Sequence, residues 1–326
     1  MSLVVCTYNR CESLRDVLAA LARQQLRGVF AEILVVDNNG TDETKLVTER
    51  ARMTSYWPVR YLFEPRQGKS YACNLAIRQA RGQWIAFTDD DTIPESGWAQ
   101  SLYEAFVSQQ ADCVGGQILP LWLANPPAWL LRPAMQEELW GKLALLDRGR
   151  MLKIAEPAQQ GFLYGANVAF RKDVLLETGL FRTDIGPRGR EQLKCEDTEL
   201  VGRLVALGKR VVYAPEAIVY HKVPPHRMRL SYFRRWQFNW SRTMTRLAAS
   251  PIPAVPQWYV REWLSNGLRV LRAYGRGDLD RAVKLDLVFW HQCGRIVETL
   301  RQRWTIQESA NGRKAISSGR CASAPS

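Results

Sequence analysis

The sequence predicts an α/β protein in which helices cover both faces of a mostly parallel β-sheet. Its apolar runs are continuous rather than alternating, which is typical of strands that are buried on both faces. Each of the first runs is followed by a segment with helical spacing. Polar residues follow the ends of three runs, and in such sheets ligands bind at the carboxyl ends of the strands. We therefore expect a functional site at that edge.

The first strand is predicted in SLVVCTYN, residues 2–9. Ser13 can cap the helix that follows, whose buried face consists of Leu14, Val17, Leu18 and Leu21. A second strand is predicted over residues 32–36, and Thr41 in the polar turn after it can cap the next helix.

The alternation continues with a strand over residues 59–64 and a helix over 68–82, which Gly82 ends. A fourth strand is predicted over 83–91. Ser96 can cap a helix that extends to about residue 109, and residues 111–118 return as a strand.

Three strand ends carry polar groups, at Thr7–Arg10, Asp37–Gly40 and Asp89–Asp91. Alternate side chains of an extended segment share a side, so Asp89 and Asp91 are expected to face together and Asp90 to point away. Two carboxylates within about 4–5 Å repel each other unless a cation bridges them. Oxygen ligands suit Mg²⁺ or Mn²⁺. The alternative is a solvated acidic turn before Pro94.

Charge divides the chain in two. Residues 1–221 hold 26 Lys and Arg and 26 Asp and Glu, whereas residues 222–326 hold 19 basic and 6 acidic residues. We therefore expect the neutral part, residues 1–221, and the basic part, residues 222–326, to have different functions.

Other features of the sequence narrow the class of protein. The seven cysteines include no CxxC pair, which indicates reduced thiols. No secretory leader and no uncharged apolar window of about 18 residues is present, so a cytoplasmic location is expected. The absence of GxGxxG and GxxxxGK[ST] argues against dehydrogenases and P-loop enzymes.

Five segments in order carry a family resemblance: VVCTYNR, ILVVDNNGTDET, RQGKSYACNLAIRQARGQWIAFTDDD, YGANVAFRKDVLLETGLF and CEDTELVGRLVALGKRVVYAPEAIVYH. Together they resemble the inverting nucleotide-sugar glycosyltransferases of family 2, which have the GT-A fold. The resemblance covers residues 1–222 and implies a GT-A catalytic domain there. It also implies metal-dependent transfer of a sugar from a nucleoside diphosphate sugar to an acceptor hydroxyl, with Mg²⁺ or Mn²⁺ as the cofactor.

The resemblance assigns roles to individual residues. Donor-binding positions are Thr7, Tyr8, Arg10, Asp37, Arg66, Lys69, Asp89, Gly165 and Asn167. Asp37 corresponds to an aspartate that accepts the N3–H of uracil, which favours UDP- or dTDP-sugars because cytosine lacks that proton. Many members have two acids where this chain has VVDNN, so the base-reading role falls to Asp37 alone.

The same resemblance assigns metal ligands and a base. The metal positions are Asp89, Asp91 and His221, with Asp91 in direct contact. Asp197 matches the catalytic base, and Glu196 is expected to orient the acceptor or a loop. Each assignment has a structural alternative: packing for Tyr8, a solvated loop for Arg66 and Lys69, a strand-end histidine for His221, and charge at a helix N-terminus for Glu196 and Asp197.

The C-terminal part is predicted to be a basic, amphipathic helical extension over residues 223–305, followed by a disordered tail over 306–326. Apolar residues at 230, 233, 236, 240, 244 and 247 follow helical spacing. The arginines around them are Arg227, Arg229, Arg234, Arg235, Arg242 and Arg246. This helix could lie on an anionic membrane, making the protein peripheral to the inner face of the cell membrane. It could instead pack on the body with its arginines in water.

The acceptor implied by the resemblance is a glycan or a lipid-linked glycan. Two other classes stay open at this point. A nucleotidyltransferase normally has a glycine-rich turn after its first strand, which CTYNRCES lacks. A basic nucleic-acid-binding or membrane-binding protein without catalytic activity would explain the C-terminal module. Acid clusters at two strand ends would repel phosphates, so no nucleic-acid partner is expected.

Overall fold

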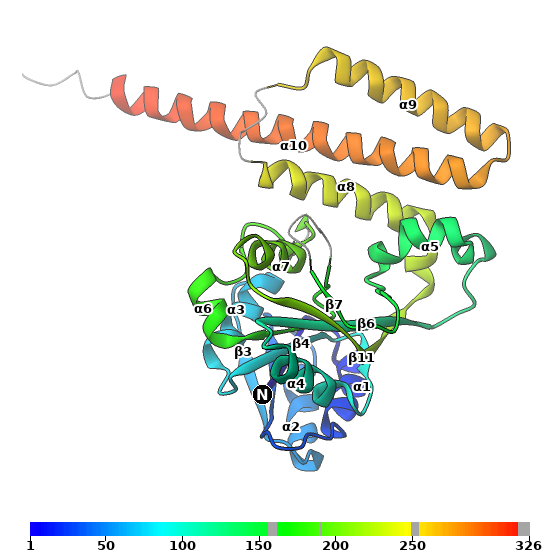
Figure 1. The fold of residues 1–326 in the computed structure, drawn as a ribbon. Helices are drawn as coiled ribbons and strands as arrows, with labels where there is room; N and C mark the ends of the chain where they lie inside the picture. Colours follow the sequence, from blue (N-terminus) through cyan, green and yellow to red (C-terminus); the bar gives the residue numbers. More distant parts are fainter. Residues whose placement is uncertain (156–161, 190, 249–253, 319–326) are drawn as a thin grey trace, which may run out of the picture. The chain divides into compact units, whose positions relative to one another are not determined.

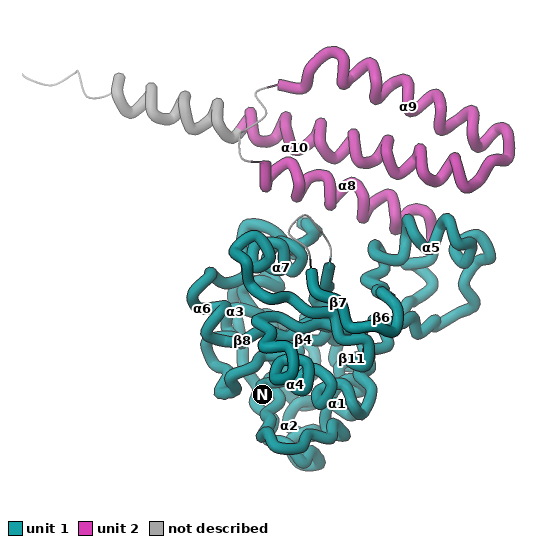
Figure 2. The backbone as a smooth tube through the Cα atoms, viewed as in Figure 1, with its two compact units in different colours: residues 1–228 teal, residues 229–326 magenta. Residues whose placement is uncertain are grey.

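In the computed structural model of the protein, residues 1–155, 162–189, 191–248 and 254–318 are described, with side chains as far as Trp304. The chain divides into two compact units, Met1–Met228 and Arg229–Ser326 (Figure 2). The division falls six residues after the boundary expected from the sequence, because the last strand and a short 3₁₀ helix (η3, Pro225–Met228) belong to the first unit.

The first unit is built on a central sheet whose strand order is β3-β2-β1-β4-β8-β6-β11-β5, with β7 beside β11. Pairing is parallel among β1 to β4 and between β6 and β11, while β8, β5 and β7 run antiparallel to their neighbours. The strands are β1 (Ser2–Thr7), β2 (Glu32–Asp37), β3 (Val59–Phe63), β4 (Trp84–Asp89), β5 (Thr92–Pro94), β6 (Cys113–Trp122), β7 (Lys153–Ile154), β8 (Asn167–Arg171) and β11 (Val211–Val223). A separate hairpin joins β9 (Pro187–Arg188) to β10 (Glu191–Gln192).

Helices lie on both sides of this sheet, with α1, α2 and α4 on one side and α3, α6 and α7 on the other (Figure 1). Their bounds are α1 (Cys11–Ala22), α2 (Thr44–Thr54), α3 (Lys69–Gln79), α4 (Trp98–Gln109), η1 (Ala128–Leu131), α5 (Pro133–Leu139), η2 (Trp140–Leu143), α6 (Lys172–Thr178) and α7 (Glu196–Ala206). Every residue of β2 is buried, as a strand covered on both faces requires. The predicted fold class is confirmed.

The predicted helix caps are wrong. Neither Ser13, Thr41 nor Ser96 caps a helix, because α1, α2 and α4 begin at Cys11, Thr44 and Trp98. A different residue, Asp42, serves two helices. Its Oδ2 accepts the Cys11 N–H at 2.8 Å, and its Oδ1 accepts the Thr44 N–H at 3.1 Å and the Thr44 hydroxyl at 2.6 Å. Asp42 therefore satisfies backbone donors at the start of both α1 and α2.

The second unit consists of three helices in the described residues, α8 (Leu230–Leu247), α9 (Gln257–Gly275) and α10 (Leu279–Ser318). Both α8 and α9 pack along α10, which confirms the predicted helical extension. Close packing is visible at Gly294, where a Cβ atom would lie 2.3 Å from the Phe238 carbonyl oxygen. Helix α10 continues into the segment expected to be disordered, and residues 319–326 lie outside the described part.

Three of the four arginines of α8 form ion pairs within this unit, and Arg235 is exposed. Arg234 pairs with Asp286 at 2.6 Å, while Arg242 and Arg246 reach the two carboxylate oxygens of Glu298 at 2.8 and 2.5 Å. These three side chains thus join α8 to α10. Among the described helices, none combines the length and apolarity that a membrane span needs.

Candidate active site

The acidic turn lies at the end of β4, and each of its carboxylates has a basic partner. The strand ends at Asp89, whose Oδ1 lies 2.6 Å from Lys69 Nζ on α3. Asp90 is buried and accepts hydrogen bonds from the Thr7 hydroxyl at 2.8 Å and from Arg10 Nη1 at 2.9 Å. Arg10 Nη1 also lies 3.1 Å from Asp91 Oδ2.

The side-chain alternation expected across this turn does not hold. Asp90 and Asp91 share Arg10, and Asp89 is held separately by Lys69. The physical reason is that the extended strand stops at Asp89, so strand alternation no longer sets the direction of the next two side chains.

Strand pairing brings His221 to Asp91. β11 runs antiparallel to β5 with His221 opposite Thr92, and the Lys222 N–H donates to the Asp91 carbonyl at 2.8 Å. As a result, His221 Nε2 lies 3.2 Å from Asp91 Oδ1. Arg227, from η3, completes this group with Nη2 2.9 Å from Asp91 Oδ2 and Nη1 3.2 Å from His221 Nε2.

The surroundings separate the pKa values of the two neighbouring acids. Burial alone would raise the pKa of Asp91, but the charges of His221, Arg227 and Arg10 outweigh burial and hold that pKa well below its usual range. For Asp90, burial dominates and raises the pKa to about 6, although Arg10 opposes it. Asp91 is therefore the carboxylate that stays ionised, and Asp90 is a packed support for the turn.

The metal ligands expected from the sequence are only partly assembled. Across the described residues, no group of three or more His, Cys, Asp or Glu side chains is arranged to hold a metal ion. Asp89 is drawn to Lys69, away from a shared site. Asp91 and His221 are the two that the fold brings together.

The Asp91–His221 pair does suit a cation. A ring nitrogen such as His221 Nε2 can either donate one hydrogen bond or accept one, so it cannot donate to Asp91 and accept from Arg227 at the same time. The other ring nitrogen, Nδ1, is buried and has no hydrogen-bond partner. A carboxylate oxygen and a ring nitrogen that face each other at 3.2 Å can be shared by one cation, and Mg²⁺ commonly binds one or two carboxylates together with substrate phosphates.

Helix α7 begins with two acidic residues, Glu196 and Asp197. Asp197 accepts backbone N–H groups from Gly165 at 2.5 Å on Oδ2 and from Thr198 at 2.8 Å on Oδ1. Glu196 is buried, and burial together with the charge of Asp197 raises its pKa to about 7. Glu196 Oε1 lies 3.9 Å from Lys69 Nζ, so Lys69 stands between Asp89 and the start of α7.

The end of β2 forms a further polar group. Asp37 is buried and accepts the Gly40 N–H on Oδ1 and the Tyr61 hydroxyl on Oδ2, each at 2.8 Å. Burial and the bond to Asp37 raise the pKa of Tyr61, which keeps that hydroxyl a donor. Each carboxylate oxygen has two lone pairs, so Asp37 retains capacity for another donor. Tyr8, at the adjacent strand end, is half-exposed.

The loop with Arg66 is organised by its own contacts. Arg66 forms a two-pronged ion pair with Glu64, at 2.9 Å from both nitrogens, and its guanidinium lies 4.7 Å from the centre of the Tyr71 ring. Asn38 accepts the Gly68 N–H at 2.7 Å and donates to the Arg66 carbonyl at 2.8 Å. The end of β2 therefore sets the path of the loop that leads to Lys69.

Two predicted sugar-lining residues have other surroundings. Asn167 is fully buried, donates to the carbonyls of Gln117 at 2.9 Å and Ala217 at 2.7 Å, and accepts from Trp98 Nε1 at 2.8 Å. Both amide hydrogens of Asn167 are thus donated within the sheet, and its oxygen accepts from helix α4, while its assignment to the donor stays a prediction. At Gly165, a Cβ atom would lie 2.9 Å from Asp197 Oδ2, so the missing side chain makes room for that carboxylate.

Arg227 is the site residue that the sequence analysis missed. It was grouped with the arginines of the following helix, yet it contacts both Asp91 and His221. Pro224 and Pro225 just before it are a signal that the chain turns at this point, and the Arg227 N–H donates to the Pro224 carbonyl at 2.9 Å.

The family model of glycosyl transferase family 2 matches residues 2–179, which is more than half of the chain and includes the acidic turn. The chain belongs to glycosyl transferase family 2. This membership confirms the resemblance and decides against the nucleotidyltransferase and against a protein without catalytic activity.

Relatives of this family 2 glycosyltransferase include the glucosyl-dolichyl phosphate glucuronosyltransferase of Haloferax volcanii. The two are 27% identical over 251 residues, which cover 75% of this chain and 77% of the relative. The succinoglycan biosynthesis protein ExoM of Rhizobium meliloti is 25% identical over 249 residues, which cover 75% and 74%.

Among solved structures, the mannosyltransferase PcManGT of Pyrobaculum calidifontis, determined with GDP-mannose and Mn²⁺, has a TM-score of 0.63. It is 16% identical, and the match covers 92% of this chain and 86% of that one. At this identity the likeness concerns the fold, which is GT-A in both.

Proposed function

We propose that this glycosyltransferase moves a sugar, with inversion at C1, from a UDP- or dTDP-sugar to a hydroxyl of a glycan or lipid-linked acceptor. The observation that carries the proposal is the arrangement of one sheet edge. Asp91 and His221 face each other there among basic side chains, and Asp197 is oriented by two backbone donors. The names of the two relatives, which mention glucosyl-dolichyl phosphate and succinoglycan biosynthesis, support an acceptor of this class.

The donor would lie along the strand ends. Asp37, with Gly40 and Tyr61 fixing its carboxylate, would accept the N3–H of uracil or thymine. Arg10 and Arg227 would exchange their ion pairs with the acidic turn for contacts to the diphosphate. Lys69, whose pKa the carboxylates of Asp89 and Glu196 raise against the effect of burial, would remain a cation beside it.

Asp91 and His221 would hold Mg²⁺ or Mn²⁺ together with the diphosphate. Such an ion supplies charge neutralisation to the leaving group. The neighbouring solved structure, which was determined with Mn²⁺ and a nucleoside diphosphate sugar, supports this assignment.

Transfer requires one proton acceptor. As the acceptor oxygen forms its bond to C1, the bond from C1 to the diphosphate breaks and the hydroxyl proton passes to Asp197. The nucleoside diphosphate leaves with the bonding electrons. The two backbone N–H groups occupy one lone pair on each oxygen of Asp197, which leaves a second lone pair for this proton, and they fix the orientation of the carboxylate. Glu196, buried next to it, would hold the base and Lys69 in position.

A ligand screen tests the donor assignment. Thermal shift with UDP-, dTDP- and GDP-sugars should show stabilisation by the uracil and thymine donors, larger with Mn²⁺ than without. Asp91→Ala should remove the increment due to Mn²⁺ while leaving the metal-free shift. If the Mn²⁺ increment survives in that variant, the metal assignment is wrong. If GDP-sugars stabilise the protein most, the role given to Asp37 is wrong.

A further inference from the structure

Helix α9 carries a row of apolar side chains that the described residues of the second unit leave exposed. Val260, Leu264, Leu268 and Leu271 are 36, 56, 55 and 68% exposed. Their spacing of four, four and three residues places them on one side of the helix. The opposite side is buried and contains Tyr259, Asn266, Val270 and Ala273. We call the exposed row, with its bordering arginines, the α9 outer face.

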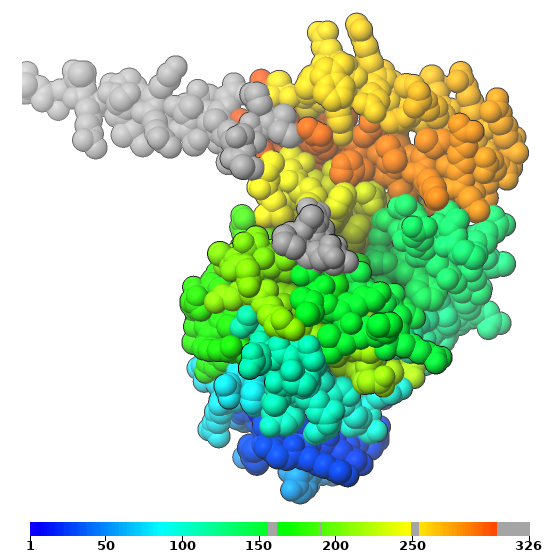
Figure 3. Space-filling model, viewed as in Figure 1, coloured from blue at the N-terminus to red at the C-terminus, as the bar shows by residue number. Residues whose placement is uncertain are grey.

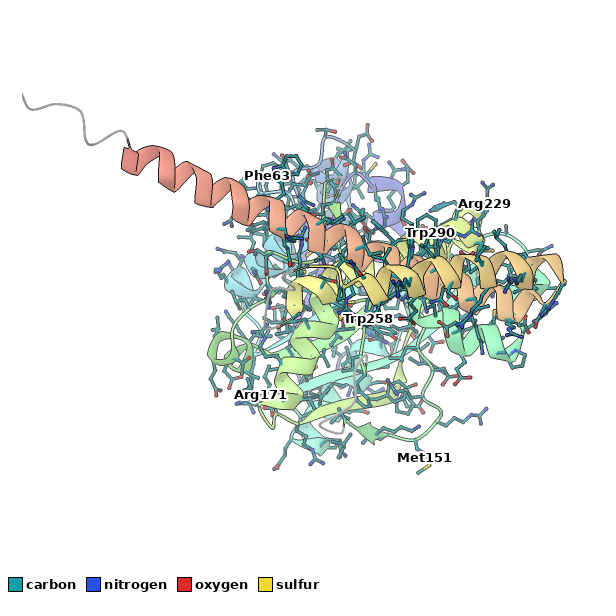
Figure 4. All side chains as sticks on the ribbon, turned by 90° about the horizontal axis from the view of Figure 1, so that it is seen from above. Phe63, Met151, Arg171, Arg229, Trp258 and Trp290 are labelled. Atoms are coloured by element: carbon teal, nitrogen blue, oxygen red, sulfur yellow. The ribbon has the colours of Figure 1, made fainter. Side chains whose placement is uncertain are left out.

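Arginines border this row. Arg261, Arg269, Arg272 and Arg276 are all exposed. Arg261 lies three residues before Leu264, and Arg272 lies four residues after Leu268, so each is a neighbour of a leucine on the helix surface. Trp258, in the first turn of α9, is 62% exposed (labelled in Figure 4). The side chains of α9, in yellow to orange, stand out from the surface of the helical unit in Figure 3.

This composition is that of a helix that lies in a membrane interface. Such helices combine exposed leucines and aromatic residues with Lys or Arg beside them, and they bind anionic lipids through both. Helix α8, which the sequence favoured for this role, has Arg234, Arg242 and Arg246 occupied by the acids of α10. Its Trp236 and Trp240 stack on each other, and Trp240 packs against His291.

We propose that the α9 outer face binds an anionic membrane surface, so that the enzyme meets a lipid-linked acceptor at that surface. The acceptor part rests on the proposed function, whereas the surface itself rests on α9. Charge favours lipid over a second copy of the chain. Residues 222–326 hold 19 basic and 6 acidic residues, and Asp286 and Glu298 are already paired internally. Two copies joined through α9 would bring arginine-bordered patches together without enough acids between them.

The test is co-sedimentation of the full chain with vesicles. One set contains phosphatidylglycerol and phosphatidylcholine, and the other contains phosphatidylcholine alone. Binding is expected to the anionic set at low salt, with partial release at high salt because salt screens the arginines. Replacing Leu264, Leu268 and Leu271 together by Gln should weaken binding by at least about tenfold, since three exposed leucines lose their apolar burial in the interface. Replacing Arg269, Arg272 and Arg276 by Gln should weaken binding and flatten its salt dependence.

The matched control changes exposed apolar residues of another helix. Leu46 and Met53 on α2 are 44 and 86% exposed, and Leu46→Gln with Met53→Gln should leave vesicle binding unchanged. The proposal is overturned if the parent protein ignores anionic vesicles, or if the α9 leucine variant binds them as well as the parent does. It is also overturned if sedimentation velocity shows a dimer that this variant alone disrupts.

Donor hydrolysis in solution separates this proposal from the proposed function. The α9 variants should hydrolyse the nucleotide sugar at the rate of the parent, because they lie in the other unit from the site residues. Vesicle binding without any turnover of a UDP- or dTDP-sugar would support the α9 outer face and contradict the donor assignment.

Discussion

Replacing Gly165 by alanine is expected to lower turnover without weakening donor binding. A Cβ atom at this position would lie 2.9 Å from Asp197 Oδ2 and 3.2 Å from Asp197 Cβ, so the carboxylate must move. The movement breaks the 2.5 Å hydrogen bond from the Gly165 N–H. A hydrogen bond to a charged group contributes about 1.5–3 kcal/mol. If that bond holds the base in line with the acceptor, its loss corresponds to a decrease in kcat of roughly 10- to 150-fold.

The measurement is steady-state transfer with saturating donor, together with calorimetric titration of the nucleoside diphosphate. Gly202→Ala is the matched control, because Gly202 lies in the same helix α7 and its Cβ would meet nothing within 4 Å. That change should leave kcat unchanged and stabilise the helix by about 0.5–1 kcal/mol. If Gly165→Ala turns over at the rate of the parent while Asp197→Asn is inactive, the hydrogen bond from Gly165 does not position the base.

Three further outcomes follow from the same contacts. Asp197→Asn should reduce kcat by on the order of 10²–10⁴ with nucleotide affinity retained, measured by transfer and titration; a larger loss in Glu196→Gln would exchange the two roles. Arg227→Ala should raise the affinity for Mn²⁺, measured by electron paramagnetic resonance of free Mn²⁺, because the guanidinium no longer competes for Asp91; unchanged affinity would argue against a site at Asp91 and His221. Burial raises the pKa of Glu196 from 4.5 to about 7, so between these two pH values the folded protein keeps a proton that the unfolded chain has released. The contribution of Glu196 to the stability of the fold therefore falls as the pH rises from about 4.5 to 7. Glu196→Gln should therefore gain in Tm relative to the parent between about pH 5 and 8, and a pH-independent difference would contradict the raised pKa.

Local patterns in the sequence predicted the features that depend on local chemistry. The strands of a sheet covered on both faces appear as uninterrupted apolar runs, and the acidic turn appears as three carboxylates after one of them. The positions of Asp91 and Asp197 at the ends of such elements were also open to prediction, since helix and strand ends face the edge of the sheet.

Contacts between side chains that are far apart in the sequence could not be predicted from local patterns. Asn167 donates the two hydrogens of its amide nitrogen to carbonyls on β6 and β11, which lie fifty residues before and fifty residues after it in the sequence. Arg227 reaches Asp91 across 136 residues of sequence. In both cases the side chain alone is compatible with a surface role, and only the strand order decides its partners. The predicted cap of α1 failed for the same reason, because the Cys11 N–H at the start of α1 donates to Asp42, 31 residues later in the sequence.

The double role of Asp42 has a consequence for how the rim of the sheet opens. One carboxylate closes the first turns of both α1 and α2, next to the loops that carry Arg10 and the Asn38–Gly40 turn. Neither loop can separate from the other without breaking the hydrogen bond from the Cys11 N–H to Asp42. The two loops should therefore open as one cooperative unit, and the amide protons of Cys11 and Thr44 should exchange with solvent at matched rates. A donor that binds either loop would then slow the exchange of both.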